Sequence, residues 1–161
     1  MAELPAELQL RVLLRSATVG GLARMEYCSA AVDDSVEAVH TTMRDGGRDC
    51  ALVFDQGRLV GIFTERDLLF ALNRNEDLAQ PIKQLMTADP QTVSHEASLL
   101  DVVELMDTGG YRRLPVLDSD GQPDGVIDAK MLTSFLVEHY PEAVYNQASQ
   151  RDVTARHREG A

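Results

Sequence analysis

The 161-residue sequence contains no tryptophan, and only 5% of its residues are aromatic. Proteins that bind single-stranded nucleic acid stack the bases on aromatic side chains, so this scarcity argues against that function. Basic residues are also few, because 15 Lys and Arg stand against 26 Asp and Glu and give a formal net charge of -11. A negative surface repels DNA and anionic membranes unless a basic patch overrides it, and Arg112 with Arg113 is the only adjacent basic pair. We therefore expect no nucleic-acid or membrane partner.

Cysteine and long apolar runs are scarce as well. The two cysteines, Cys28 and Cys50, fit neither a CxxC motif nor the spacing of a zinc site. We expect both to pack as small apolar side chains in a reducing compartment. The apolar stretch Val12–Leu14 is too short for the core of a signal peptide. The expectation is a cytoplasmic protein without a metal.

An internal repeat is the most informative feature that the sequence does contain. When the chain is shifted by 63 residues against itself, similar residues superpose in unbroken order, and one inserted residue then makes the shift 64. The superposed pairs include Ser35 with Ser98, Val39 with Val102, Met43 with Met106, Asp55 with Asp118, Gly61 with Gly125 and Leu68 with Leu132.

Each copy predicts the same order of elements. Apolar residues spaced three and four apart predict an amphipathic helix, which Gly46-Gly47 and Gly109-Gly110 are expected to end. Asp34 with Glu37, and Ser98 with Asp101, are expected to cap the first turns of these helices. Short apolar runs then predict a hairpin in each copy, and a second helix closes the copy. The hairpin runs are residues 51–54 with 59–63 and 114–117 with 125–127, and the closing helices include 68–72 and 132–136.

The predicted fold is therefore α/β, of the α+β kind, with two tandem β-α-β-β-α repeats. One repeat alone would bury little surface, so we expect the two to pack together pseudo-symmetrically. The predicted boundaries are an N-terminal helix in residues 1–17, the first repeat in 18–77, the second repeat in 78–140 and a polar C-terminal tail in 141–161.

The run Gly61-Ile62-Phe63-Thr64-Glu65-Arg66-Asp67, after an apolar hairpin and a helix that ends in Gly-Gly, resembles a CBS domain. Two such copies resemble a Bateman module in a stand-alone protein of the bacterial type, and the run Arg112–Asp118 is also typical of the family. The resemblance covers residues 18–140. It implies paired α/β units that form homodimers, adenine-containing ligands bound between the repeats, a regulated protein partner and no catalysis.

The motif at the end of the first hairpin supplies the predicted ribose contacts. A carboxylate one turn into a helix can accept hydrogen bonds from two ribose hydroxyls, and Asp67 has Thr64 one turn earlier on the same face. By the resemblance, Thr64 and Asp67 contact ribose and phosphate, and Ile62 and Arg66 of the same motif also line the site. The alternative is that Thr64 and Asp67 only cap the helix, although capping and binding are compatible.

The remaining predicted contacts follow from the family's use of both repeats in each cleft. The resemblance implies that Arg112 and Arg113 face the phosphates, whereas a solvated strand end with surface ion pairs is the alternative for this pair. Four further residues are expected around the adenine: Pro90, Gln91, Tyr111 and Pro115.

The second copy departs from the motif, because Asp128 replaces the threonine and Met131 replaces the aspartate. Asp49 and Cys50 stand where the second copy has its arginine pair, and a phosphate beside Asp49 and Asp128 would meet like charge. We therefore predict one nucleotide site per chain. Two other basic residues leave a weaker second site open, namely Arg48 and Lys130.

These residues predict a regulatory module with no obligatory cofactor. AMP is the first candidate ligand, followed by ADP and ATP, NAD and S-adenosylmethionine. The alternative is a ligand-independent scaffold for dimerisation or protein interaction. An enzyme is not predicted, because neither a nucleophile with a base nor a histidine at ligand or triad spacing is present. The sequence leaves open the orientation of the dimer and the regulated target.

Overall fold

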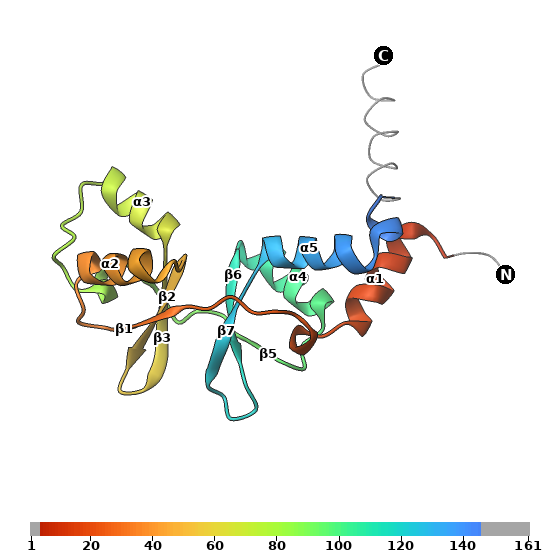
Figure 1. The fold of residues 1–161 in the computed structure, drawn as a ribbon, viewed down its shortest axis with the longest axis horizontal. Coiled ribbons are helices and arrows are strands. Elements are labelled where there is room, and N and C mark those ends of the chain that lie inside the picture. The colour runs from red at the N-terminus through yellow and green to blue at the C-terminus, as the bar shows by residue number, and fades with distance from the viewer. Residues whose placement is uncertain (1–3, 146–161) are drawn as a thin grey trace, which may run out of the picture. The chain divides into compact units, whose positions relative to one another are not determined.

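The computed structural model of the protein describes residues 4–145, and these divide into two compact units (Figure 1). We call residues 4–23, 93–113 and 127–145 unit 1, and residues 24–92 and 114–126 unit 2. The order of elements in both repeats is the predicted one, although the opening strand of the second repeat is split into the short strands β4 (Thr87–Ala88) and β5 (Val93–Ser94).

Unit 2 is built on a four-stranded sheet in the order β1-β2-β3-β4. Strand β1 (Cys28–Ala31) lies parallel to β2 (Cys50–Asp55), which forms an antiparallel hairpin with β3 (Arg58–Thr64). Helix α2 (Val36–Gly46) lies between β1 and β2 in the sequence, and α3 (Glu65–Asn73) follows β3. Buried side chains from both helices and the sheet form one core cluster, with Val39, Met43, Val53, Phe63 and Leu68 among its members.

Helix α2 ends at the predicted Gly-Gly pair, but its N-cap is Ser35, one residue after the predicted Asp34. Ser35 is the N-cap and accepts a hydrogen bond from the backbone N–H of Ala38 at 3.1 Å. Asp34, the expected cap, instead accepts a bond from the backbone N–H of Ala31 at 2.8 Å. Gly47 adopts a left-handed conformation with φ 62° and ends the helix, as the Gly-Gly pair predicts.

The opening segment of the second repeat packs on the first repeat. Its short 3-10 helix η2 (Ile82–Gln84) places Ile82 fully inside the core of unit 2. The backbone N–H of Ile82 donates to the carbonyl of Asp34 at 2.7 Å, and the N–H of Val36 donates to the carbonyl of Gln80 at 3.0 Å. Residues 78–86 therefore help to build the first repeat's core.

Unit 1 shows the reciprocal arrangement. The 3-10 helix η1 (Val19–Gly21), in the opening segment of the first repeat, packs beside the start of α4 (Leu99–Gly109) of the second repeat. The N–H of Val19 donates to the carbonyl of Ala97, and the N–H of Leu99 donates to the carbonyl of Ala17, both at 2.9 Å. Each repeat is thus completed by the segment that opens the other one.

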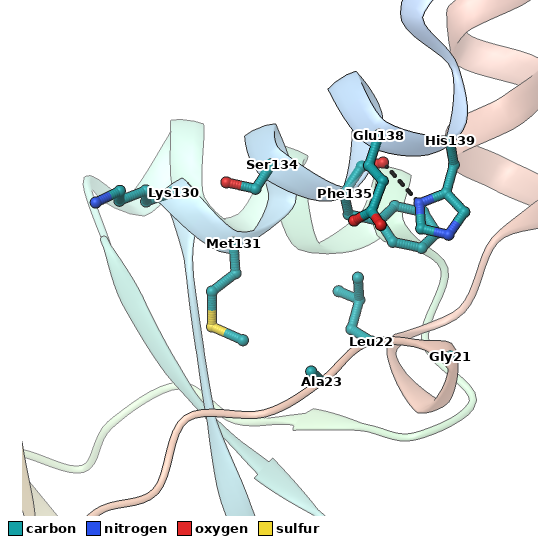
Figure 2. Close-up of a pocket in the computed structure, with 9 residues that line it drawn as sticks. All are labelled: Gly21, Leu22, Ala23, Lys130, Met131, Ser134, Phe135, Glu138 and His139. Carbon is teal, nitrogen blue, oxygen red and sulfur yellow. Dashed lines mark hydrogen bonds between the residues drawn. The ribbon is translucent and has the colours of Figure 1, made fainter.

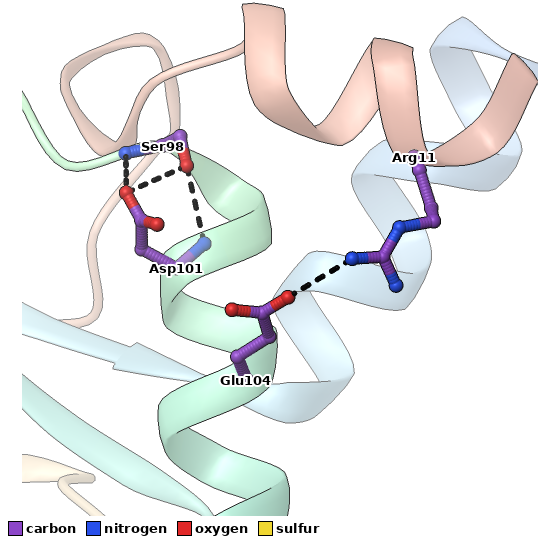
Figure 3. A network of polar contacts seen from close by, with 4 residues as sticks. All are labelled: Arg11, Ser98, Asp101 and Glu104. Carbon is purple, nitrogen blue, oxygen red and sulfur yellow. Dashed lines mark hydrogen bonds and ion pairs between the residues drawn. The ribbon is translucent and has the colours of Figure 1, made fainter. Parts of the chain in front are cut away.

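The rest of unit 1 consists mainly of helices. Helix α1 (Ala6–Ser16) packs on α4, where the Arg11 guanidinium pairs with the Glu104 carboxylate at 3.3 Å (Figure 3). Ser98 and Asp101 form a capping box at the start of α4, as predicted. Helix α5 (Ala129–His139) also belongs to unit 1, whereas most of β6 (Arg113–Leu117) and of β7 (Pro123–Asp128) belongs to unit 2.

Residues 141–145 correct the prediction of a polar tail that begins at residue 141. They are helical, and Ala143 is buried, because the turn after Tyr140 continues with a hydrogen bond from the N–H of Val144 to the carbonyl of Tyr140 at 3.3 Å. The remainder of the predicted tail, residues 146–161, lies outside the described residues.

Both cysteines are free thiols that pack in unit 2. Cys50 is fully buried beside Leu52 and Ile62, whereas Cys28 packs against the core on the other face of the sheet. The thiol of Cys28 donates to the carbonyl of Cys50 at 3.5 Å, and burial raises the pKa of this thiol. The prediction that they pack as small apolar residues is confirmed.

Candidate functional site

The start of α3 holds the two residues that the sequence predicts for the ribose. The Thr64 backbone N–H and the Thr64 hydroxyl both donate to Oδ2 of Asp67, each at 2.8 Å. The backbone N–H of Asp67 donates back to the Thr64 hydroxyl at 3.4 Å, which completes a capping box. Both side chains are half-buried. The capping alternative is therefore present in the structure, and it fixes the position of the Asp67 carboxylate.

The backbone at the end of the first hairpin brings two further residues to the start of α3. Cys50 pairs with Thr64 across the hairpin, and the N–H of Glu65 donates to the carbonyl of Asp49 at 3.4 Å. Asp49 thus lies beside the start of α3. Arg66 is exposed, and its guanidinium carbon lies 5.4 Å from the centre of the Phe70 ring on the same helix.

A segment that sequence reasoning missed lies next to the end of β3. Strand β4 pairs with it, so that Thr87 is opposite Ile62 and Ala88 is opposite Gly61. A Cβ atom on Gly61 would collide with the side chain of Met86. The signal in the sequence was Gly61 itself, because glycine inside a strand often marks the close approach of another segment. Residues 86–88 are therefore nearer to the Thr64 end of β3 than Pro90 and Gln91 are.

The structure does not bring every predicted residue in unit 2 to the start of α3. Ile62 and Pro115 are buried, so both serve the packing of the core. Pro90 lines a polar cavity with Gly57 and Leu59 at the turn of the first hairpin. Leu59 and Thr64 are five positions apart, which corresponds to about 17 Å of strand. Gln91 is exposed and follows Pro90. Their place around an adenine stays a prediction.

Three further predicted residues belong to unit 1. Tyr111 is half-buried and its ring lies over Gly109, while Arg112 is exposed and Arg113 half-buried. The N–H of Ala129 donates to the carbonyl of Arg112 at 3.1 Å, so the start of β6 lies beside the start of α5. The role of these arginines as phosphate contacts stays a prediction.

The start of α5 is the equivalent of the start of α3, and it has a different chemistry. The Asp128 carboxylate caps the helix by accepting a bond from the N–H of Met131 at 2.8 Å. Met131 then faces a cavity of about 390 Å³ together with Leu22 (Figure 2). Phe135 lines the same cavity and stacks on His139, with ring centres 4.2 Å apart. Where the first repeat has a carboxylate, the second has an apolar wall.

The two basic residues that left a second site open are placed differently. Arg48 forms an ion pair with Glu26 in unit 2. Lys130 lines the cavity beside α5, but its side chain is exposed and its ammonium group points away from Met131 (Figure 2).

Residues 4–145 contain neither a cluster of metal ligands nor a membrane-spanning helix. No three His, Cys, Asp or Glu side chains lie close enough together to hold a metal ion. No helix in this part of the chain has the length and apolar character that a membrane span requires.

A comparison with protein families matches the chain to the model of the CBS domain, once over residues 22–74 and again over residues 82–138. The two matches fall within the predicted repeats 18–77 and 78–140, whose limits stay a prediction.

The curated proteins that resemble the chain are mostly longer. An uncharacterized 17.7 kDa protein of Acidianus ambivalens is 32% identical over 60% of this chain and 58% of its own length. The CBS domain-containing protein CBSCBSPB5 of Arabidopsis thaliana is 30% identical over 63% of this chain, which spans only 19% of that protein. The inosine-5'-monophosphate dehydrogenase of Korarchaeum cryptofilum is 34% identical over 84% of this chain and 26% of its own length.

Solved structures share the fold. A CBS-domain protein of Agrobacterium tumefaciens is 26% identical, with a TM-score of 0.65 over 73% of this chain and 98% of its own. A CBS domain protein of Pyrobaculum aerophilum complexed with AMP is 22% identical, with a TM-score of 0.63 over 70% of this chain and 88% of its own. The CBS domain pair of MJ0100, in complex with 5'-methylthioadenosine and S-adenosyl-L-methionine, is 20% identical, with a TM-score of 0.65 over 74% and 95%.

Proposed function

Because the chain belongs to the CBS domain family, we propose that it is a regulatory module that binds an adenine nucleotide or a related adenosyl ligand. The ribose of this ligand binds at the start of α3, on Thr64 and Asp67. One observation carries the proposal: the capping box holds the half-buried Asp67 carboxylate in place before any ligand arrives. A carboxylate that is already oriented loses little side-chain freedom on binding.

The cap leaves Asp67 able to accept further hydrogen bonds. Both bonds from Thr64 end on Oδ2, and an ionised carboxylate offers about four acceptor positions on its two oxygens. The two hydroxyls of a ribose can therefore donate to the same carboxylate. Such charge-assisted bonds are about twice as strong as bonds between neutral groups.

Structural relatives support the class of ligand. The Pyrobaculum aerophilum protein was solved with AMP, and the MJ0100 pair with 5'-methylthioadenosine and S-adenosyl-L-methionine, all of which carry an adenosyl group. AMP is the first candidate ligand, followed by ADP and ATP, and then by NAD and S-adenosylmethionine.

We place a single nucleotide site on each chain. At the position of Asp67 the second repeat has Met131, whose thioether is only a weak acceptor for a ribose hydroxyl. Arg112 and Arg113 remain the proposed phosphate contacts. Replacing both arginines by alanine should weaken AMP binding by about tenfold or more, because a lost charge-assisted bond costs about 1.5–3 kcal/mol. Equal affinity in this double variant would remove the arginines from the site.

Calorimetry with AMP, ADP, ATP, NAD and S-adenosylmethionine tests the proposed function. We expect saturable binding of at least one ligand with one site per chain, and its loss in Asp67→Ala. No saturable heat with any of the five, or undiminished binding in the variant, would contradict the proposal.

We further propose that the protein forms a homodimer, signals to a protein partner in the cytoplasm and catalyses no reaction. The exposed face of α3 supports a dimer, since Leu69, Phe70 and Leu72 are 66%, 48% and 51% exposed. The same face favours the second candidate function, a ligand-independent scaffold. Measuring the melting temperature with each ligand separates the two, because a ligand that binds the folded state raises it and a scaffold shows no shift.

A further inference from the structure

Helix α1 in unit 1 has two apolar faces, of which only one is packed. Leu14 is buried and Leu10 and Leu13 are half-buried on the side that packs against α4. The ion pair between Arg11 and Glu104 adds a second attachment between these helices (Figure 3). The orientation of α1 in unit 1 is thus set by contacts that leave its other side uncovered.

The uncovered side carries a continuous apolar stripe. Leu8 and Val12 are four residues apart and lie on the same face of α1, and Leu4 lies just before the N-cap of the helix. Leu4, Leu8 and Val12 are 51%, 45% and 52% exposed. Single exposed apolar residues are ordinary in proteins, but three within nine residues, two of them on one helix face, are typical of an interaction surface.

The charged residues beside this stripe can form ion pairs with the same residues on a second copy of the chain. Glu7 and Arg11 are four residues apart and border the stripe on one side, and both are exposed. Among the described α-helices, α1 is the only one with more basic than acidic residues, on a chain with a net charge of -11. Two chains that repel each other as a whole can therefore approach at α1 with the least repulsion.

We propose that the stripe of Leu4, Leu8 and Val12 binds the same stripe on a second copy of the chain, with the two α1 helices antiparallel about a two-fold axis. With Leu8 against Leu8, Val12 of the second copy lies toward the first turn of α1, the end of the helix that Leu4 precedes. The two-fold axis places the side of α1 that carries Glu7 and Arg11 next to the same side of the second copy, and the two helices run in opposite directions. A rise of 1.5 Å per residue then puts Glu7 about 3 Å along the axis from Arg11 of the second copy. Arg11 can serve this carboxylate and Glu104 together, because a guanidinium has five N–H donors.

The size of the stripe sets the strength of this contact. A stable interface buries about 800 Å² on each partner, and three half-exposed aliphatic side chains supply only part of that area. The α1 contact is therefore a weak association that grows with protein concentration and weakens with salt. It is separate from the proposed dimer through α3, and it does not depend on whether the chain binds a nucleotide.

Disulfide trapping tests the position of the two-fold axis. In the full-length chain, Leu8→Cys should form an intermolecular disulfide under mild oxidation much faster than Asp107→Cys, an equally exposed control on α4. The unaltered chain controls for its own two thiols, since Cys50 is buried and Cys28 is half-buried. Trapping of Leu8→Cys no faster than the control would overturn the proposal.

A charge exchange tests the pairing of Glu7 with Arg11, in a Leu69→Glu background that weakens association through α3. Glu7→Arg and Arg11→Glu should each weaken the remaining self-association by about fivefold, because each replaces two attractive pairs by two repulsive ones. The triple variant Glu7→Arg/Arg11→Glu/Glu104→Arg, which also reverses the ion pair with α4, should restore it, as measured by analytical ultracentrifugation. A monomer at every concentration in the Leu69→Glu background, or a triple variant no better than the singles, would contradict the proposed contact.

Discussion

The starts of α3 and α5 occupy equivalent places in the two repeats, yet they differ in what they offer to a ligand. At α3 a capping box fixes the carboxylate of Asp67, whereas at α5 a single cap from Asp128 leaves Met131 against an apolar cavity. Both helices have a side-chain N-cap, and α5 has one without an aspartate at the position of Asp67, so helix capping alone does not require Asp67. The comparison indicates that the first repeat keeps a polar group that folding could do without, and this is the group to which we assign ligand binding.

A substitution that makes the first repeat resemble the second should have the largest effect, and this effect is on the affinity for AMP. Asp67→Met removes the acceptor for two ribose hydroxyls, so the affinity for AMP should fall by about 10- to 150-fold, the equivalent of about 1.5–3 kcal/mol. The matched control is Met131→Ala, which should leave the affinity within about twofold of the unaltered chain. Isothermal titration calorimetry measures both, and an equal loss in the two variants would remove the difference between the repeats.

Gly61 and Gly125, which precede α3 and α5, should differ in how much stability the protein loses when each is replaced by alanine. At Gly125 a Cβ atom would lie 2.7 Å from Cβ of Arg24 and 3.2 Å from the carbonyl oxygen of Met25, at a φ of +138°. Gly125→Ala should therefore destabilise the protein by about 2 kcal/mol. Gly61→Ala meets the flexible side chain of Met86, which can move, and should cost about 1 kcal/mol. Urea denaturation measures both, and a larger loss at Gly61 would contradict this order.

Making the second repeat resemble the first should create a site. Asp128→Thr together with Met131→Asp restores the threonine and aspartate of the first repeat and can rebuild its capping box. We expect the stoichiometry of AMP binding to rise from one to two per chain, with the second site about tenfold weaker because the cavity beside α5 is largely apolar. A stoichiometry that stays at one would show that the aspartate is not sufficient.

Loss of a cap should have a similar, smaller effect in both repeats. Thr64→Ala and Asp128→Ala each remove a side-chain acceptor from the first turn of a helix, at a cost of about 1 kcal/mol. Thermal unfolding followed by circular dichroism measures this cost. Only Thr64→Ala should also weaken AMP binding, and a similar loss of binding in Asp128→Ala would move the site toward α5.

The smallest expected effect is on the pH dependence of stability, and it comes from Tyr27 near the start of the first repeat. Burial raises the pKa of Tyr27, with a further contribution from Asp124, and its hydroxyl donates to the carbonyl of Pro123 at 3.2 Å. Because the folded state holds this proton more tightly than the unfolded state, the stabilisation is complete below a pH of about 10 and is lost as the pH rises through the raised pKa. Tyr27→Phe should therefore lose less stability between neutral and strongly alkaline pH, and an unchanged pH dependence would argue against this role.

Local patterns in the sequence were sufficient for the elements of each repeat. Helix faces follow from the spacing of Val39, Met43 and Val102, and left-handed glycines end both α2 and α4. The packing of each repeat's opening segment on the other repeat was not predicted. The residues that carry this packing, Val19 and Ile82, are isolated apolar residues with no periodic neighbours. Their burial depends on packing against parts of the chain that are distant in sequence.

The same limit applies to the candidate site. The carboxylate of Asp67 and its cap could be derived from residue spacing, because a capping box is local in the sequence. The residues around it could not, since strand pairing puts Thr87 beside Ile62 and leaves Pro90 at the turn of the hairpin. The position of Asp49 beside the start of α3 also follows from strand pairing rather than from any motif.

A crystal structure of the protein soaked with AMP tests the central claim most directly. We predict density for one adenylate per chain, with both ribose hydroxyls within hydrogen-bonding distance of the Asp67 carboxylate and no nucleotide beside Met131. A chain that binds AMP in the cavity along α5, or that shows no adenylate at the start of α3, would contradict the account.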